Sequence, residues 1–126
     1  MNKLIFTLIL LFYNVCFLTA KTYDVIETTT YYGYQDTNGI TAIPEGWTVS
    51  YGNLGITIEY KDDVVLNFLF TGQPSTKGNI INRAAIETSS NLTYNISITT
   101  DKDGNTIIRW SIDNGMQFFF KLKEQK

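Results

Sequence analysis

Histidine is absent from this sequence, and cysteine occurs only once, as Cys16. Without histidine the commonest general base in enzymes is missing, and a single cysteine forms no disulfide within the chain. Zinc and copper sites built on imidazole or thiolate ligands are excluded for the same reason. We therefore expect no bound metal and no cofactor.

Charged residues are also sparse, at 17% of the sequence. Twelve acidic residues against ten basic ones give a net charge of −2. The only local concentration of positive charge is formed by Lys121 and Lys123, and Glu124 follows it directly. This balance disfavours nucleic acid and anionic membrane surfaces as partners.

Carboxylates are the only remaining acid–base groups of the usual catalytic kinds, and most fall in predicted turns. These acids are Asp36, Glu45, Asp62, Asp63, Asp101, Asp103 and Asp113. A carboxyl group acts as a general acid when burial or a neighbouring like charge raises its pKa, and turn positions provide neither. We expect no enzymatic activity, with a hydrolase that uses carboxylates alone as the open alternative.

The first twenty residues have the pattern of a secretory signal peptide. Lys3 precedes an apolar run from Leu4 to Phe12, and the segment ends on the small residue Ala20. Tyr13 and Asn14 interrupt the run, which is shorter than the roughly 20 apolar residues of a membrane-spanning helix. We expect cleavage after Ala20, a mature domain over residues 21–126 without a membrane span, and a secreted or periplasmic location.

Apolar and polar residues alternate along residues 54–60, 92–99 and 108–112, with the period of two that is typical of half-buried strands. Residues 64–70 and 116–120 are almost continuously apolar, as in central strands or strands covered on both faces. Further strands are expected at residues 22–32, 40–43 and 47–51. Residues 78–90 fit either a strand or a helical turn, and we favour a strand or an irregular crossing.

Turn residues separate these stretches at short intervals. Asp103-Gly104 and Asn114-Gly115 are hairpin signals, because glycine adopts positive φ at little steric cost. They predict a three-stranded antiparallel meander over residues 92–122. The whole pattern predicts a single all-β antiparallel domain of seven or eight short strands, arranged as a sandwich or a small barrel.

Two N-glycosylation sequons begin at Asn91 and Asn95. Both asparagines share the polar parity of their strand with Thr93 and Ser97, so we expect both on an exposed face. In a eukaryotic source glycans would cover that face. In a bacterial source the motif would have no such meaning.

Aromatic residues offer the remaining candidate for a binding site. Three tyrosines gather at one strand end close to amides, a carboxylate and a tryptophan, and we take this set as the predicted ligand-binding residues: Tyr31, Tyr32, Tyr34, Asp36, Asn38 and Trp47. Aromatic faces beside hydrogen-bonding groups suit sugar rings or a protein partner. We expect a non-catalytic binding module that recognises a protein or a carbohydrate through loops at one end of the sheet.

A structural or self-assembling protein is the alternative function. Residues 64–70 and 118–120 are strongly β-prone and low in charge. An uncovered sheet edge at either segment would pair with another chain.

Overall fold

The computed structural model describes residues 20–33, 38–112 and 115–125. Most of the predicted signal peptide, together with Tyr34 and Asp36, lies outside these residues. No helix in the described part of the chain is long and apolar enough to cross a membrane.

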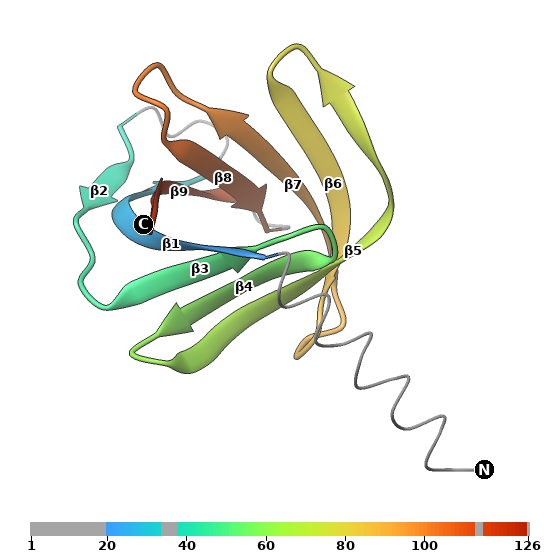
Figure 1. Cartoon of the computed structure of the whole chain (residues 1–126), viewed down its shortest axis with the longest axis horizontal. Helices are drawn as coiled ribbons and strands as arrows, with labels where there is room; N and C mark the ends of the chain where they lie inside the picture. The colour runs from blue at the N-terminus through green and yellow to red at the C-terminus, as the bar shows by residue number, and fades with distance from the viewer. Residues whose placement is uncertain (1–19, 34–37, 113–114, 126) are drawn as a thin grey trace.

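Nine strands make up the described structure (Figure 1). They are β1 (Lys21–Tyr32), β2 (Ile40–Ala42), β3 (Trp47–Tyr51), β4 (Gly55–Tyr60), β5 (Asp63–Lys77), β6 (Ile80–Glu87), β7 (Thr93–Thr100), β8 (Thr106–Ser111) and β9 (Met116–Glu124).

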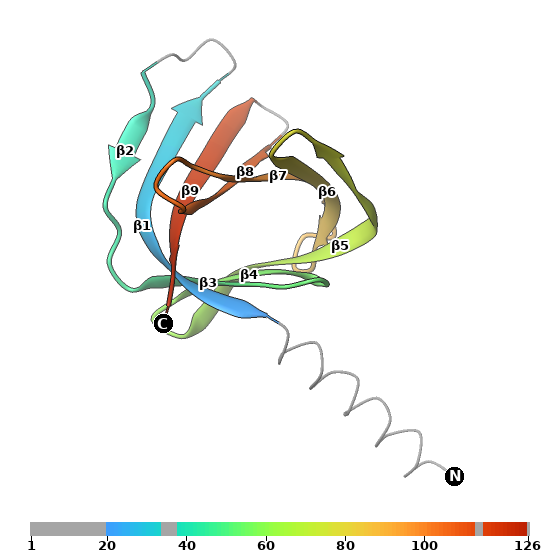
Figure 2. The same cartoon turned by 45° about the horizontal axis from the view of Figure 1, so that its top comes forward.

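Eight of the strands form a closed antiparallel barrel. From β3 to β9 each strand pairs with the next along the chain, and β1 pairs with both β3 and β9 to complete the circle. Figures 1 and 2 show the strands curling round into this closed wall. The all-β antiparallel prediction is confirmed, and of the two architectures that it left open the chain adopts the barrel.

The ninth strand, β2, lies outside the barrel. The first residues of β1 pair with β3, and further along β1 Thr28–Thr30 pairs with β2. One edge of β2 faces β1, and the other edge has no partner strand among the described residues. The open edge of the sheet is therefore β2. The two segments considered for self-assembly, residues 64–70 and 118–120, belong to β5 and β9, which are paired on both sides in the barrel wall.

Side chains of alternate residues fill the barrel with apolar groups. The buried core consists of Tyr23, Val25, Val49, Ile56, Ile58, Phe68, Ala85, Ile96, Ile98, Ile108, Trp110 and Leu122. Trp110, whose parity in the sequence places it on the apolar face, is 4% exposed. Its ring stacks on Phe118 at 5.4 Å and meets Phe120 edge-on at 4.9 Å between ring centroids.

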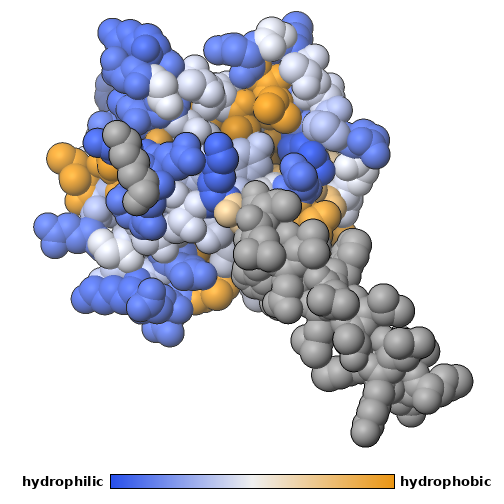
Figure 3. Space-filling model, viewed as in Figure 1, coloured by the Kyte–Doolittle hydropathy of each residue, from blue (hydrophilic) through white to orange (hydrophobic). Residues whose placement is uncertain are grey.

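The outer surface is mainly polar, with smaller apolar areas. Figure 3 shows one such area at the left edge of the view, where β2 lies in Figure 1. Ile40 in β2 is 59% exposed, and Ile43, which directly follows β2, is 81% exposed. The open edge of the sheet therefore carries exposed aliphatic side chains.

The predicted C-terminal meander is confirmed, since β7, β8 and β9 pair in succession. The turn between β7 and β8 closes with a bond from the Gly104 N–H to the Asp101 carbonyl, and Gly104 has φ of +83°. A side chain at this position would be strained, which explains why the sequence signal was reliable here.

Residues 80–87 form the strand β6, so the strand interpretation of this ambiguous segment is correct. The sequence did not predict that β5 continues to Lys77, because Gly72 and Pro74 resemble a loop. A register shift between Thr71 and Ser75 accommodates both residues, and pairing with β6 resumes beyond it. The β5–β6 hairpin consequently extends past the start of β4 (Figure 2).

Candidate functional site

The outer face of β1, β9 and β8 carries a recess. On β9, Phe118 and Phe120 pack against the core, so Phe119 and Lys121 between and beyond them face outward. A register shift in β1 between Val25 and Glu27 reverses the facing of the residues that follow. Strict alternation from the buried Val25 would have turned Glu27 inward, whereas the bulge sets it opposite Lys121 on the outside.

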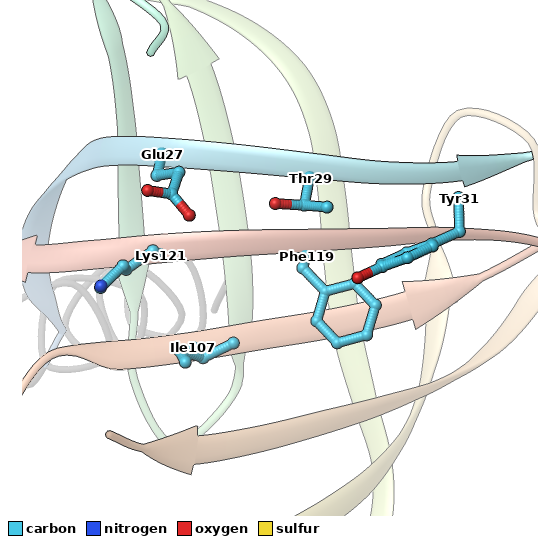
Figure 4. A pocket seen from close by; sticks show the side chains of 6 residues that line it. All are labelled: Glu27, Thr29, Tyr31, Ile107, Phe119 and Lys121. Carbon is cyan, nitrogen blue, oxygen red and sulfur yellow. The ribbon is translucent and has the colours of Figure 1, made fainter. Parts of the chain in front are cut away.

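This recess, which we call the outer groove, has a volume of about 180 Å³. It is lined by Glu27, Thr29, Tyr31, Ile107, Phe119 and Lys121 (Figure 4). Three of these residues come from β1, two from β9 and one from β8, so three adjacent strands of a closed wall fix the lining. Sites on strands are held more precisely than sites on loops.

The lining residues form cross-strand rows. Glu27, Lys121 and Ile107 are direct neighbours across β1, β9 and β8. In the next row Thr29 lies opposite Phe119, and the Thr29 hydroxyl shares a 3.1 Å hydrogen bond with the Thr41 hydroxyl of β2. The extra strand thus borders the outer groove and orders one of its polar groups.

Phe119 is the aromatic centre of the groove. The Tyr31 ring meets it edge-on, with 5.4 Å between ring centroids and 72° between ring planes. From the β8 side, the Arg109 guanidinium carbon lies 5.7 Å from the Phe119 centroid. Such contacts favour a fixed orientation of the ring. Phe119 therefore presents a half-buried apolar ring in a fixed orientation.

Gly39 allows the chain that leads into β2 to approach the Tyr31 ring. A Cβ atom at position 39 would lie 2.9 Å from Cε1 of Tyr31, and the residue has φ of +61°. Only glycine suits both the backbone conformation and the close approach. The Tyr31 ring is accordingly packed between this segment and Phe119.

Both charges of the groove lie at one end. The Lys121 ammonium forms an ion pair with Asp101 at 3.4 Å, and this carboxylate also accepts backbone N–H bonds from Asn105 and Asp103. The bond from Asn105, then the bond from Asp103 and the lysine, hold the pKa of Asp101 below its usual value. Across β9, the Glu27 carboxylate makes neither a hydrogen bond nor an ion pair within the described part of the chain, so its acceptor capacity is open.

Of the predicted ligand-binding residues that the structure describes, Tyr31 alone lines the outer groove. Tyr32 is 60% exposed, and Asn38 is exposed in the segment before β2. Trp47 packs against the core, with its ring 5.1 Å from Tyr60 and 6.3 Å from Phe120.

Five of the six groove-lining residues were not predicted, and for most of them the sequence carries little signal. Phe119 is hidden in a continuous apolar run, where alternation does not separate the two faces. The outward position of Glu27 depends on the bulge in β1, which the sequence does not reveal. Lys121 opposite Glu27 was the one detectable sign, since unlike charges often pair across strands.

Both sequon asparagines are exposed. Asn91 has φ of +61° in the turn after β6, and Asn95 lies on the outer face of β7. Strand parity accounts for the exposure of Asn95, whereas Asn91 is exposed because it lies in the turn before β7. Their glycosylation stays a prediction.

Among the described residues no group of three or more histidine, cysteine, aspartate or glutamate side chains is arranged to hold a metal ion. Comparison of the chain with protein-family models, with curated proteins and with solved structures found no match.

Proposed function

We propose that this protein is a non-catalytic, exported binding protein that holds a carbohydrate ring in the outer groove. The observation that carries the proposal is the half-exposed Phe119, which Tyr31 and Arg109 fix beside a carboxylate, an ammonium group and hydroxyl groups. A pyranose ring presents C–H groups to an aromatic surface and hydroxyl groups to polar side chains. The groove offers both kinds of contact.

The size of the groove supports a small ligand. Its volume of about 180 Å³ is below the roughly 300–1,000 Å³ of pockets that enclose drug-sized molecules. One sugar ring of a longer glycan suits such a volume, with the rest of the glycan lying over the outer face. We therefore expect recognition of a terminal or branching sugar unit.

The polar lining supports binding without catalysis. Glu27 is the only carboxylate among the groove-lining residues, whereas glycoside hydrolysis commonly employs a pair that flanks the scissile bond. Glu27 is placed to accept hydrogen bonds from sugar hydroxyls, and Lys121 is placed to donate them.

The test begins with a glycan array and continues with titration calorimetry of the best ligand. Phe119→Ala should weaken binding about tenfold, because truncation of an aromatic anchor commonly costs more than 1 kcal/mol. Glu27→Gln keeps the shape of the side chain and should weaken binding several-fold through loss of a charged acceptor.

Tyr32→Ala is the matched control, since Tyr32 is an exposed aromatic of β1 outside the groove lining. It should bind like the unaltered protein. Loss of binding in Tyr32→Ala with full binding in Phe119→Ala would move the site to the end loops. A protein ligand that needs Phe119, with no glycan bound, would keep the site and contradict the ligand class.

A second candidate function, self-association, is favoured by the open edge of β2. Exposed edges are templates for pairing with another chain, and β2 carries no charged residue that would oppose this. Sedimentation velocity over a range of concentrations should detect dimers if this proposal is right. Ile40→Lys should abolish them, and Leu54→Lys, at an exposed leucine away from β2, should not. A monomer at all concentrations would contradict this second proposal.

A further inference from the structure

Arg83 is a charged residue on the inner side of the barrel wall. It lies on β6 two residues before Ala85, which is fully buried, and opposite Ile96, which is also fully buried. The alternation of β6 thus directs the Arg83 side chain toward the apolar interior. Charged side chains are rare inside small barrels unless they are paired.

An aromatic ring lies directly against this arginine, and two further rings lie beyond it. Its guanidinium carbon lies 4.2 Å from the centroid of Phe70, and Phe70 meets Tyr51 edge-on at 6.3 Å. Tyr51 in turn lies 6.5 Å from Tyr23. We call these four residues, Tyr23, Tyr51, Phe70 and Arg83, the inner cluster. They come from β1, β3, β5 and β6.

Arg83 lacks a partner for its charge within the described part of the chain. Its Nε atom is buried and has no hydrogen-bond partner there, and none of the ion pairs of the described residues includes it. A buried polar group that is left unpaired is costly, and a buried charge without a counter-ion more so. The guanidinium lies over the Phe70 ring, and this contact leaves the buried Nε–H without a hydrogen-bond partner among the described residues.

The phenol of Tyr51 interacts with this charge. Burial, followed by the neighbouring Tyr23, raises the pKa of Tyr51, and the Arg83 charge acts in the opposite direction. The hydroxyl of Tyr51 therefore remains a proton donor at neutral pH, close to the guanidinium.

Solvent reaches the inner cluster. Arg83, Tyr51 and Phe70 are all half-buried rather than enclosed. Phe70 is bonded through its N–H to the Leu54 carbonyl, just before β4 begins, and β5 then continues without β4 beside it. The cluster accordingly lies at the end of the barrel that carries the β3–β4 turn.

We propose that the inner cluster binds the carboxylate of a small organic acid with an apolar body. The planar guanidinium donates two parallel hydrogen bonds to the carboxylate oxygens, a geometry that arginine matches better than lysine. The Tyr51 hydroxyl supplies a third donor. The aromatic rings contact the apolar body, and one positive charge balances one negative charge. This site is separate from the outer groove and does not depend on the proposed carbohydrate binding.

Benzoate is the probe, titrated by calorimetry into the protein expressed with its own N-terminal segment. Benzoate should bind and should raise the melting temperature, whereas benzyl alcohol, which has the same ring without the charge, should not. Arg83→Met retains most of the apolar stem and should weaken benzoate binding by about tenfold or more. Tyr51→Phe should weaken it several-fold.

Arg109→Met is the matched control, because Arg109 also lies over a phenylalanine but on the outside of the barrel. It should bind benzoate normally. Arg83→Met should also melt at a higher temperature than the unaltered protein when no benzoate is present, since it removes a buried Nε–H donor that has no hydrogen-bond partner in the described structure. If that variant does not fold, Arg83→Lys keeps the charge without the two-pronged geometry and should still bind several-fold more weakly. Equal benzoate binding by the unaltered protein and the Arg83 variants, or equal binding of benzyl alcohol, would overturn the proposal.

Discussion

The two faces of β9 carry the same residue type with different consequences. Phe118 and Phe120 point into the barrel, where both contact Trp110. Phe119 lies between them in sequence and faces outward, where it contacts Tyr31 and Arg109. Three identical side chains are thus divided between core and groove by strand alternation alone. Residue type did not decide which phenylalanine stabilises the fold and which is available to a ligand.

The two arginines that lie over phenylalanine rings show the same division. Arg109 stacks on Phe119 at the outer surface, where water solvates its remaining donors. Arg83 stacks on Phe70 inside, where its Nε atom has no partner in the described structure. The donors of the outer arginine are therefore solvated, whereas the buried Nε–H of the inner arginine has no hydrogen-bond partner among the described residues.

The largest expected effect is on the inner face. Trp110→Ala should reduce the free energy of unfolding by about 3–5 kcal/mol, because it leaves a large cavity between two phenylalanine rings. Phe119→Ala, the outer counterpart, should cost about 1 kcal/mol through its lost ring contact. Denaturant titration measures both values. Similar losses in the two variants would mean that inner and outer aromatics stabilise the barrel equally.

The next effect concerns Glu87, a carboxylate that is 3% exposed near one end of the barrel interior. It accepts hydrogen bonds from the Ser89 hydroxyl, the Ser89 N–H at 2.7 Å and the Ser90 N–H at 3.1 Å. The Ser89 bonds lower its pKa in the folded protein, although burial opposes them. The carboxylate therefore stabilises the fold above its unfolded pKa of about 4.3, and this stabilisation is lost as pH falls through the lower folded value.

Glu87→Gln should reduce the free energy of unfolding by about 1 kcal/mol at neutral pH, since a neutral acceptor bonds more weakly than a charged one. Its stability should also fall less between pH 5 and pH 3 than that of the unaltered protein. Melting curves across this range measure both effects. Asp101→Asn is the comparison variant, because the pKa of Asp101 is also lowered at a carboxylate outside the barrel, and this variant too should lose less stability on acidification. An undiminished acid loss in Glu87→Gln would assign the pH dependence to other groups.

The smallest effect is expected at Arg109. Arg109→Gln removes the cation over Phe119 and should cost about 0.5–1 kcal/mol, the range for such contacts at exposed sites. It should also loosen the Phe119 ring, which the ring resonances in an NMR spectrum report. A loss above about 2 kcal/mol would mean that the outer face contributes to stability more than its exposure implies.

Much of the fold could be predicted from the sequence because local rules agree with the long-range structure over residues 92–122. Alternation identified the inner face that holds Ile108 and Trp110, and the Asp-Gly pair identified a turn. Closure of the barrel was beyond such rules, since pairing between β1 and β9 has no local signal. The last part of β5 was missed because Gly72 and Pro74 disfavour a regular strand, and the bulge that accommodates them depends on β6.

The candidate site was less predictable than the fold. Tyr31 was predicted as a binding residue because tyrosines cluster at the end of its strand, and it lines the outer groove. Trp47, which was predicted beside it, packs against the core. Phe119 could not be assigned to the outer face, because it lies in a continuous apolar run that conceals strand parity. Glu27 could not be assigned to it either, because the single extra residue of the bulge in β1 reverses the facing of the residues that follow.

Pairing of the first barrel strand with the last has a consequence for how the protein is made. Tyr23 pairs with Glu124, so the seam of the barrel joins residues from opposite ends of the described chain. On the ribosome, β1 emerges first and waits for β9, which is synthesised after every other strand. Contacts this distant in sequence form slowly, and the unfinished sheet stays open until they form. A chain whose barrel is still open can pass through a translocation pore more readily than a folded one. Late closure of the barrel therefore suits the export that the N-terminal segment predicts.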